Sequence, residues 1–141
     1  MEIDITLVRR GTGMDKRKKE RREAKRALKE RWEIAKALAS ERDGHNCQMC
    51  RNHVEGKSQN VHHILPEAKE YAELYDCLNN LITLCPRCHR LGPQSAHRSG
   101  FYFTLWLEKN KPMQYNYLKS FLENKMKGGQ ETTNQNGQHT N

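Results

Sequence analysis

The sequence has few apolar residues and no long apolar run. Only 35% of its 141 residues are hydrophobic, and its mean hydropathy is −1.05. No run approaches the roughly 18 apolar residues of a membrane span, and the first residues, MEIDITLVRRG, lack the basic-then-apolar order of a secretory signal. We therefore expect an intracellular, cytoplasmic protein with no membrane partner. We also expect one small domain with extensions, whose modest core needs a staple.

The chain also lacks the even cysteine count of a disulfide framework. Four of its five cysteines form two C-x-x-C pairs, Cys47/Cys50 and Cys85/Cys88, and Cys77 is left over. In a reducing compartment such pairs are more often metal thiolates than disulfides, and no βαβ pattern supports a redox role. Two knuckles supply the four soft ligands that tetrahedral Zn²⁺ prefers. Because four thiolates saturate the ion, we expect a structural zinc, which leaves the histidines available for another role.

Positive charge exceeds negative charge and is concentrated near the N-terminus. The net charge is +8 and the isoelectric point is near 9.4, which indicates a polyanionic partner. Residues 15–31, DKRKKERREAKRALKER, contain no glycine or proline and carry ten basic against four acidic side chains, which predicts a basic helix. A solvated helix face is the simpler interpretation; contact with nucleic-acid phosphates is the alternative. The candidate phosphate contacts are Lys16, Arg17, Lys18, Lys19, Arg21, Arg22, Lys25 and Arg26.

The remaining pattern divides the chain into five segments. An N-terminal segment spans 1–14, the basic helix 15–43, a zinc-stapled core 44–98, C-terminal helices 99–126 and a disordered tail 127–141. Gly44 is the expected stop of the basic helix. Apolar spacing predicts three faces for packing: Leu28, Trp32, Ala35 and Leu38 in the basic helix; Tyr102, Leu105, Trp106 and Lys109 in the first C-terminal helix; Tyr115, Leu118, Phe121 and Leu122 in the last.

Two apolar runs in the core carry histidines. VHHIL at 61–65 reads as a strand, so the side chains of His62 and His63 should point to opposite sides and have different partners. NLITLCPRCHRL at 80–91 reads as a buried strand that leads into a helix beginning near His89. The knuckles bring the two runs together, so His89 should lie near the histidine pair.

The order C-x-x-C, His-His-Ile, then Asn-Leu-Ile-Thr-Leu-Cys-x-x-Cys-His resembles the HNH nucleases of the ββα-metal (His-Me finger) group. The similar subset carries a structural zinc between two C-x-x-C knuckles, and the resemblance covers Cys47 to His89. It implies an α+β fold, with a ββα-metal core flanked by the basic helix and the C-terminal helices. It also implies a metal-dependent hydrolase that cuts DNA, in which His63 is the general base, Asn80 braces the loop and orients His63 through a hydrogen bond, and His89 ligates a catalytic divalent metal.

The sequence departs from this pattern in two places. The position before the base is often Asp in the family and is His62 here, which fits a second metal ligand and shifts the preference from Mg²⁺ towards Mn²⁺, Ni²⁺ or Zn²⁺. The helix after His89 should end early, at RLGP. His97 could then supply a third ligand or a phosphate contact from the next loop, although we favour a solvated loop histidine. His45 and His53 are assigned to local hydrogen bonds.

Two other functions are compatible with the sequence. A non-catalytic zinc-knuckle protein that binds nucleic acid would keep the cysteines and the basic helix. Its function would not be affected by loss of His63 or Asn80. A structural adaptor would bind protein and cut nothing. His63 and Asn80 both occupy the positions that the HNH pattern gives them, which favours the nuclease. A phage or mobile-element origin would suit a nuclease of this kind.

Overall fold

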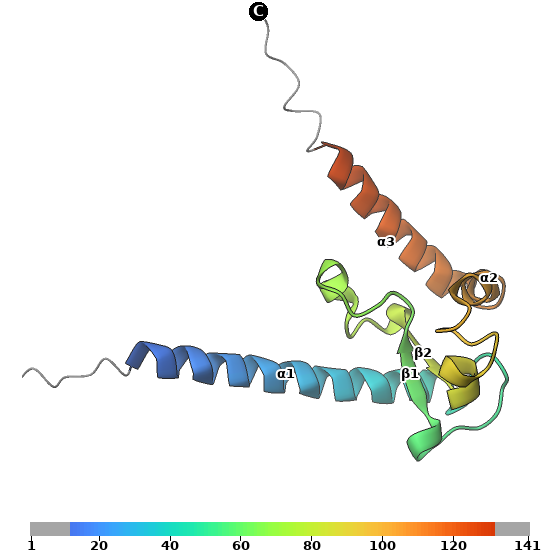
Figure 1. The fold of residues 1–141 in the computed structure, drawn as a ribbon, viewed down its shortest axis with the longest axis horizontal. Helices are drawn as coiled ribbons and strands as arrows, with labels where there is room; N and C mark the ends of the chain where they lie inside the picture. The colour runs from blue at the N-terminus through green and yellow to red at the C-terminus, as the bar shows by residue number, and fades with distance from the viewer. Residues whose placement is uncertain (1–11, 132–141) are drawn as a thin grey trace, which may run out of the picture. The chain divides into compact units, whose positions relative to one another are not determined.

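Helix α1 is the longest element of the structure, a computed structural model that describes residues 12–131. It runs from Thr12 to Arg42 (Figure 1). The chain divides into two compact units between Ile34 and Ala35, so most of α1 belongs to the first unit and its last two turns belong to the second. The helix begins three residues before the predicted start and ends one residue before the predicted end.

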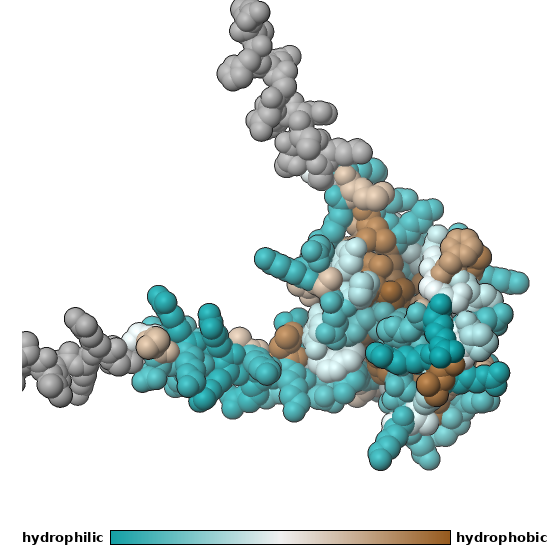
Figure 2. All heavy atoms as spheres, in the orientation of Figure 1, coloured by the Kyte–Doolittle hydropathy of each residue, from teal (hydrophilic) through white to brown (hydrophobic). Residues whose placement is uncertain are grey.

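The part of α1 in the first unit is covered by charged side chains. Figure 2 shows hydrophilic atoms along this stretch of the helix, and almost every residue from Gly13 to Ile34 is exposed. Two i,i+4 ion pairs, Lys19–Glu23 and Arg26–Glu30, each with 3.9 Å between charged atoms, add only weak support because all four side chains are solvated. Within the described range, no helix combines the length and apolar character needed to cross a lipid bilayer.

The second unit is built around a β-hairpin. Strand β1 (Asn60–His63) pairs antiparallel with β2 (Leu81–Leu84), with His62 opposite Ile82 and His63 opposite Leu81 (Figure 1). A single π-helical turn, Arg87–Leu91, follows β2, and the two strands and this turn form the predicted ββα core. Helices α2 (Gly100–Asn110) and α3 (Pro112–Glu131) come next, and short 3₁₀ turns span Gly56–Ser58, Lys69–Leu74 and Leu78–Asn80.

The apolar core is small and lies between the hairpin, the knuckles and α2. All four residues of β2 are buried, as the β-branched and apolar run predicts. The buried members of the apolar core are Cys47, Val54, Ile82, Leu84, Ala96, Phe103 and Leu107. A core of this size stabilises a domain only marginally, which agrees with the expectation that the fold requires a staple.

The outer edge of β2 is covered by groups from outside the hairpin. The buried carboxylate of Asp43 accepts a hydrogen bond of 2.8 Å from the Thr83 N–H, and the Thr83 carbonyl accepts one of 2.9 Å from the Gln48 N–H. The Leu81 carbonyl accepts bonds from the side chains of Arg42 and Gln114, at 2.7 and 2.9 Å. The backbone groups of Leu81 and Thr83 on this buried edge are thus satisfied from the end of α1 and the residue after it, from the first knuckle and from α3.

Two of the predicted packing faces are only partly correct, with Ala35 buried in α1 and Trp106 packed against the core in α2. In α1 the buried residues are Ala35, Ala39 and Ser40, whereas Leu28 and Leu38 are 42% and 46% exposed. In α2 the buried residues are Phe103 and Leu107, whereas Leu105 is 50% exposed. Both helices bury a face displaced from the predicted one, because the narrow space beside the hairpin selects which residues face it. In α3, Leu118 is 3% exposed and Tyr115 packs against the core, as predicted.

The segment boundaries also differ at the C-terminus. Helix α3 continues to Glu131, five residues into the predicted tail. Once a helix is nucleated, each added residue contributes another hydrogen bond, so α3 extends beyond its last packed side chain. The rest of the predicted tail, from residue 132, lies outside the described residues, as do residues 1–11 of the predicted N-terminal segment.

Candidate metal centre and active site

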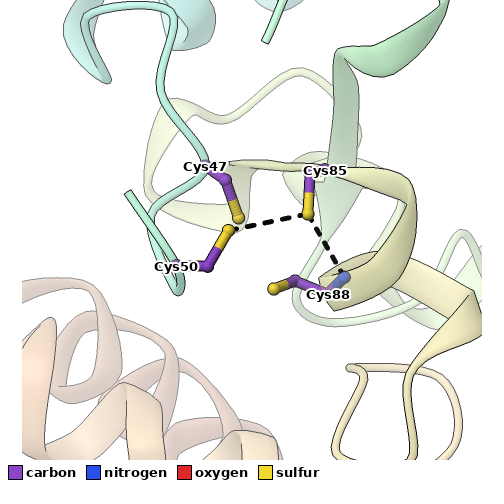
Figure 3. Close-up of side chains that lie close together, drawn as sticks. All are labelled: Cys47, Cys50, Cys85 and Cys88. Atoms are coloured by element: carbon purple, nitrogen blue, oxygen red, sulfur yellow. Dashed lines mark hydrogen bonds between the residues drawn. The ribbon is translucent and has the colours of Figure 1, made fainter. Parts of the chain in front are cut away.

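The four cysteines of the two C-x-x-C pairs meet at one point. Cys47 and Cys50 come from the first knuckle, and Cys85 and Cys88 come from the end of β2 and the following turn (Figure 3). All four sulfur atoms lie within 4.8 Å of one another, and the Sγ atoms of Cys50 and Cys85 are 3.7 Å apart. Cys77 is not part of the cluster; its sulfur lies 3.7 Å from the hydroxyl of Tyr117.

This geometry fits a tetrahedral zinc ion. With Zn–S bonds of about 2.3 Å, neighbouring sulfur atoms of a ZnS₄ centre are about 3.8 Å apart. Burial raises the pKa of the Cys88 thiol, and the nearby Cys47 raises it further. Crowded thiolates repel one another, so a cation is needed to keep all four deprotonated. The four cysteines are therefore positioned to form a structural zinc site, as the spacing predicts.

A second cluster consists of His62, His89 and His97. One ring nitrogen of each lies within 4.8 Å of the others, and the Nε2 atoms of His89 and His97 are 3.1 Å apart. The rings meet edge to face, with centroid distances of 5.1 Å for His62–His89, 4.9 Å for His62–His97 and 4.7 Å for His89–His97. Imidazole nitrogens that share a first-row metal ion at about 2.0–2.1 Å lie about 3 Å apart, so this donor set fits a divalent cation.

Three different elements position this cluster. His62 projects from β1, His89 lies in the π-helical turn, and His97 lies in the loop before α2. The loop returns to the turn through backbone hydrogen bonds from Ala96 to Cys88, at 2.9 Å, and from His97 to His89, at 3.1 Å. His97 is exposed, as we expected, but it is not an isolated loop histidine, because the loop places its ring against the other two.

Burial and positive charge favour the neutral form of these imidazoles. Burial, reinforced by the nearby histidines and by Arg90, lowers the pKa of His62 to about 3. Burial, His97 and Arg90 lower the pKa of His89 to about 4, and burial followed by Arg90 also lowers the pKa of His97. A neutral imidazole is the form that binds metal, so at neutral pH the three rings are in the protonation state that a cation requires.

These shifts predict how the cluster responds to acid. His62 and His89 should remain neutral at pH 5, where a histidine with the ordinary pKa of about 6.5 is mostly protonated. Below that ordinary value the unfolded chain takes up protons that the folded chain does not, so the two histidines should make the fold less stable as the pH falls. Imidazole nitrogen NMR of zinc-loaded protein without further metal measures this directly, and titration of both rings near pH 6.5 would contradict it.

His63 points away from this cluster, as the strand pattern predicts. Its Nε2–H donates a hydrogen bond of 2.7 Å to the backbone carbonyl of Tyr75, and its ring stacks on the Tyr75 ring at 5.4 Å between centroids. Because a carbonyl can only accept, this bond fixes the hydrogen on Nε2 and places the lone pair on Nδ1. The carboxylate of Glu67 lies 3.6 Å from Nδ1. Neither Tyr75 nor Glu67 carries a signal in the sequence that would have identified it.

Asn80 holds the loop between the two strands. It is 1% exposed, its Oδ1 accepts a bond of 2.7 Å from the Leu65 N–H, and its Nδ2 donates to the carbonyls of Leu65 and Leu74, at 3.1 and 3.2 Å. The predicted bracing role agrees with these contacts. Nε2 of His63 bonds to the carbonyl of Tyr75, the residue after Leu74, and the predicted orientation of His63 by Asn80 stays a prediction.

The other candidate residues lie apart from these clusters. Nδ1 of His45 is 3.2 Å from Oε1 of Gln59, and Nε2 of His53 is 3.8 Å from Oε2 of Glu55, in agreement with purely local roles. The eight basic residues of α1 that are the candidate phosphate contacts are exposed in the first unit. These are Lys16, Arg17, Lys18, Lys19, Arg21, Arg22, Lys25 and Arg26.

Comparison with known proteins gives a match in the region that contains the cysteine cluster and two of the three clustered histidines. Residues 47–91 match the family model described as HNH endonuclease. Neither the curated proteins nor the solved structures provide a significant match to the chain. The matched segment contains all four cysteines, His62, His63, Asn80 and His89, while His97 and the basic helix lie outside it. Residues 47–91 of this chain are therefore similar to the HNH endonuclease family, and the four cysteines of this segment are positioned for zinc.

Proposed function

We propose that this protein is a metal-dependent endonuclease that hydrolyses phosphodiester bonds in DNA. The observation that carries the proposal is the different surroundings of two adjacent histidines on β1. His62 faces two further imidazoles, whereas His63 is held by a backbone carbonyl that fixes its tautomer. One strand therefore presents a metal ligand and a general base side by side, which is the minimum that phosphodiester hydrolysis requires.

His63 accepts the proton of the attacking water. Its Nδ1 carries the lone pair, and the Tyr75 carbonyl and the stacked Tyr75 ring keep that nitrogen in place. As the proton arrives, the bond from Nε2–H to the carbonyl stabilises the imidazolium that forms. The Glu67 carboxylate, 3.6 Å from Nδ1, adds a compensating negative charge. Asn80 maintains this arrangement by fixing the loop that carries Tyr75.

His62, His89 and His97 would hold the divalent cation. When bound, that cation stabilises the negative charge that develops on the phosphate and on the leaving 3′ oxygen. Three imidazole nitrogens without a carboxylate form a soft donor set, which favours Mn²⁺, Ni²⁺ or Zn²⁺ over Mg²⁺. The structural zinc has a different role, because its four thiolates leave no ligand position for substrate. A thiolate site of this kind also suits an intracellular, cytoplasmic protein.

Helix α1 supplies affinity for DNA that does not depend on sequence. Replacing Lys18, Lys19, Arg21 and Arg22 by glutamine should weaken binding to all DNA sequences alike, and the salt dependence of log Kd should decrease by about 0.9 for each phosphate that is no longer neutralised. Binding titrations over a range of salt concentrations measure this. The matched control removes the same charge from exposed lysines of the second unit, Lys57, Lys109, Lys119 and Lys127. If both variants show the same salt dependence as the unmodified protein, α1 is only a solvated helix.

Cleavage of a supercoiled plasmid tests the proposed function. Purified protein should convert the plasmid to nicked or linear forms in the presence of Mn²⁺, Ni²⁺, Zn²⁺ or Mg²⁺, and chelator should stop the reaction. A preparation that binds DNA but cuts it with none of these ions would exclude the nuclease. The zinc-knuckle binding protein, which uses the same α1 and cysteine cluster, would then be the better description.

A further inference from the structure

A cavity of about 340 Å³ lies between the two knuckles, the loop before α2 and α2 itself. Cys50, Cys85 and Cys88 form part of its wall, so the cavity borders the proposed zinc site. Its volume lies at the lower end of the range in which proteins bind small molecules, roughly 300–1,000 Å³. The cavity can therefore accept one compact chemical group.

Two aromatic residues of α2 line this cavity. Tyr102 and Trp106 are four residues apart, so they lie on the same side of the helix. Tyr102 is 39% exposed and Trp106 is half-buried, with its indole nearly parallel to the buried ring of Phe103, at 5.8 Å between centroids and 17° between planes. The contact with Phe103 holds the indole in place. Two rings at an open cavity provide a surface on which another flat ring can stack.

The same ring contacts connect the cavity to the three-histidine cluster. The Phe103 ring also meets His62 edge to face, with 5.4 Å between centroids, so a single ring lies between Trp106 and a proposed metal ligand. The loop residues Gly92–Ser95 line the cavity, and two residues later the same loop places His97 in the cluster. A group bound in the cavity thus lies close to the proposed site of phosphodiester cleavage.

The other lining residues indicate which kind of group fits. Asn52 and Gln94 are exposed, and each amide offers a hydrogen-bond donor and an acceptor. A Cβ at Gly92 would lie 3.2 Å from Cγ of Arg87, so the glycine leaves room for the stem of this arginine along the cavity wall. Four thiolates around one divalent ion leave a net negative charge beside the cavity, which repels a phosphate but accepts a neutral ring.

We infer that this cavity binds an unpaired nucleobase of the DNA substrate. A nucleobase is flat, neutral and edged with hydrogen-bonding groups, as the aromatic and amide residues of the cavity require. A base inside a duplex is stacked and paired and cannot enter. The protein should therefore prefer DNA that has a single-stranded or unpaired nucleotide close to the cleaved bond. The inference rests on the proposed nuclease function, because that function supplies the DNA.

The emission of Trp106 reports on the cavity directly. The sequence has two tryptophans, so Trp32→Phe leaves Trp106 as the only one. Zinc-loaded protein without further metal is titrated with a short oligothymidylate and with an abasic oligonucleotide of the same length, which carries the same phosphate charge. Oligothymidylate should quench Trp106 and bind at least about fivefold more tightly, because stacking contributes about 1–3 kcal/mol for each base. The abasic strand should not quench Trp106.

Substitutions at Tyr102 test whether the cavity provides this preference. In the same Trp32→Phe background, Tyr102→Ala should bind oligothymidylate more weakly by about fivefold and the abasic strand with unchanged affinity, whereas Tyr102→Phe should retain the preference because its ring still stacks. Phe101→Ala is the matched control. Phe101 is the neighbouring residue on α2, is 79% exposed and is not a lining residue of the cavity, so its loss should change neither affinity.

Equal affinity for the two oligonucleotides, or equal effects of Tyr102→Ala and Phe101→Ala, would overturn the inference. If the protein cuts plasmid DNA but shows no preference for bases, the cavity has no part in DNA binding and the nuclease proposal stands. If the protein cuts no DNA but prefers oligothymidylate in a way that depends on Tyr102, the nuclease proposal fails and the base site stands.

Discussion

Replacing His63 by alanine should lower the rate of DNA cleavage by roughly two orders of magnitude or more, the usual effect of removing a general base. The zinc content, the fold and the affinity for DNA should be retained, because His63 contributes neither a thiolate nor a phosphate contact. Its Nε2 bonds to the Tyr75 carbonyl, its Nδ1 lies 3.6 Å from Glu67, and it is a member of neither cluster. Single-turnover cleavage, together with zinc analysis and a binding titration, measures the three properties separately.

Two further variants make this result specific. His53→Ala removes an exposed histidine whose contact is with Glu55, and it should cut at the rate of the unmodified protein. His89→Ala should also cut slowly, but through weaker metal binding, so high concentrations of Mn²⁺ or Ni²⁺ should partly restore its activity and should not help His63→Ala. Cleavage by His63→Ala at the unmodified rate, in a preparation free of contaminating nuclease, would show that the proposed active site is wrong.

Cys85→Ala should abolish zinc binding and unfold the second unit. Structural zinc in small zinc-finger peptides contributes about 10–16 kcal/mol of apparent binding energy at neutral pH, which far exceeds what a core of this size can supply. Without the ion, Cys88, at the start of the turn that carries His89 and Arg90, is no longer held to the first knuckle. Metal analysis, near-ultraviolet circular dichroism and protease resistance should all change together, and Cys50→Ala should behave in the same way.

Cys77→Ala provides the matched control for that experiment. Cys77 is the cysteine outside the cluster, and its contact is with the Tyr117 hydroxyl on α3. Its removal should leave the zinc content unchanged and lower the free energy of unfolding by about 1 kcal/mol or less. An unmodified protein that is fully folded without zinc would contradict the assignment of a structural metal.

The sequence predicts the features that depend on spacing within one segment. The equal C-x-x-C spacings indicate the four-cysteine cluster, and the alternation along β1 separates His62 from His63. The uniformly apolar run at 81–84 predicts a buried strand, and all four of its residues are buried. In each case a local periodicity or a ligand spacing determines the result, and no distant contact is needed to predict it.

The remaining features depend on contacts between distant segments. The place of His97 follows from a loop that returns to the π-helical turn, and the tautomer of His63 follows from the carbonyl of Tyr75, a group that every residue type possesses. The buried faces of α1 and α2 could be predicted only in part, for a related reason. Several faces of each helix carry apolar residues, and only the shape of the space beside the hairpin selects one of them.

The covered edge of β2 limits how the segment that matches the HNH family can be transferred to another protein. A two-stranded hairpin is at best marginally stable by itself. Here the free edge of β2 obtains hydrogen-bond partners from Asp43, Arg42 and Gln114, which all lie outside residues 47–91. A chimaera that received only the matched segment would inherit the reactive side chains but expose the unpaired edge to intermolecular strand pairing. The transferable unit must extend from the last turns of α1 to the first turns of α3.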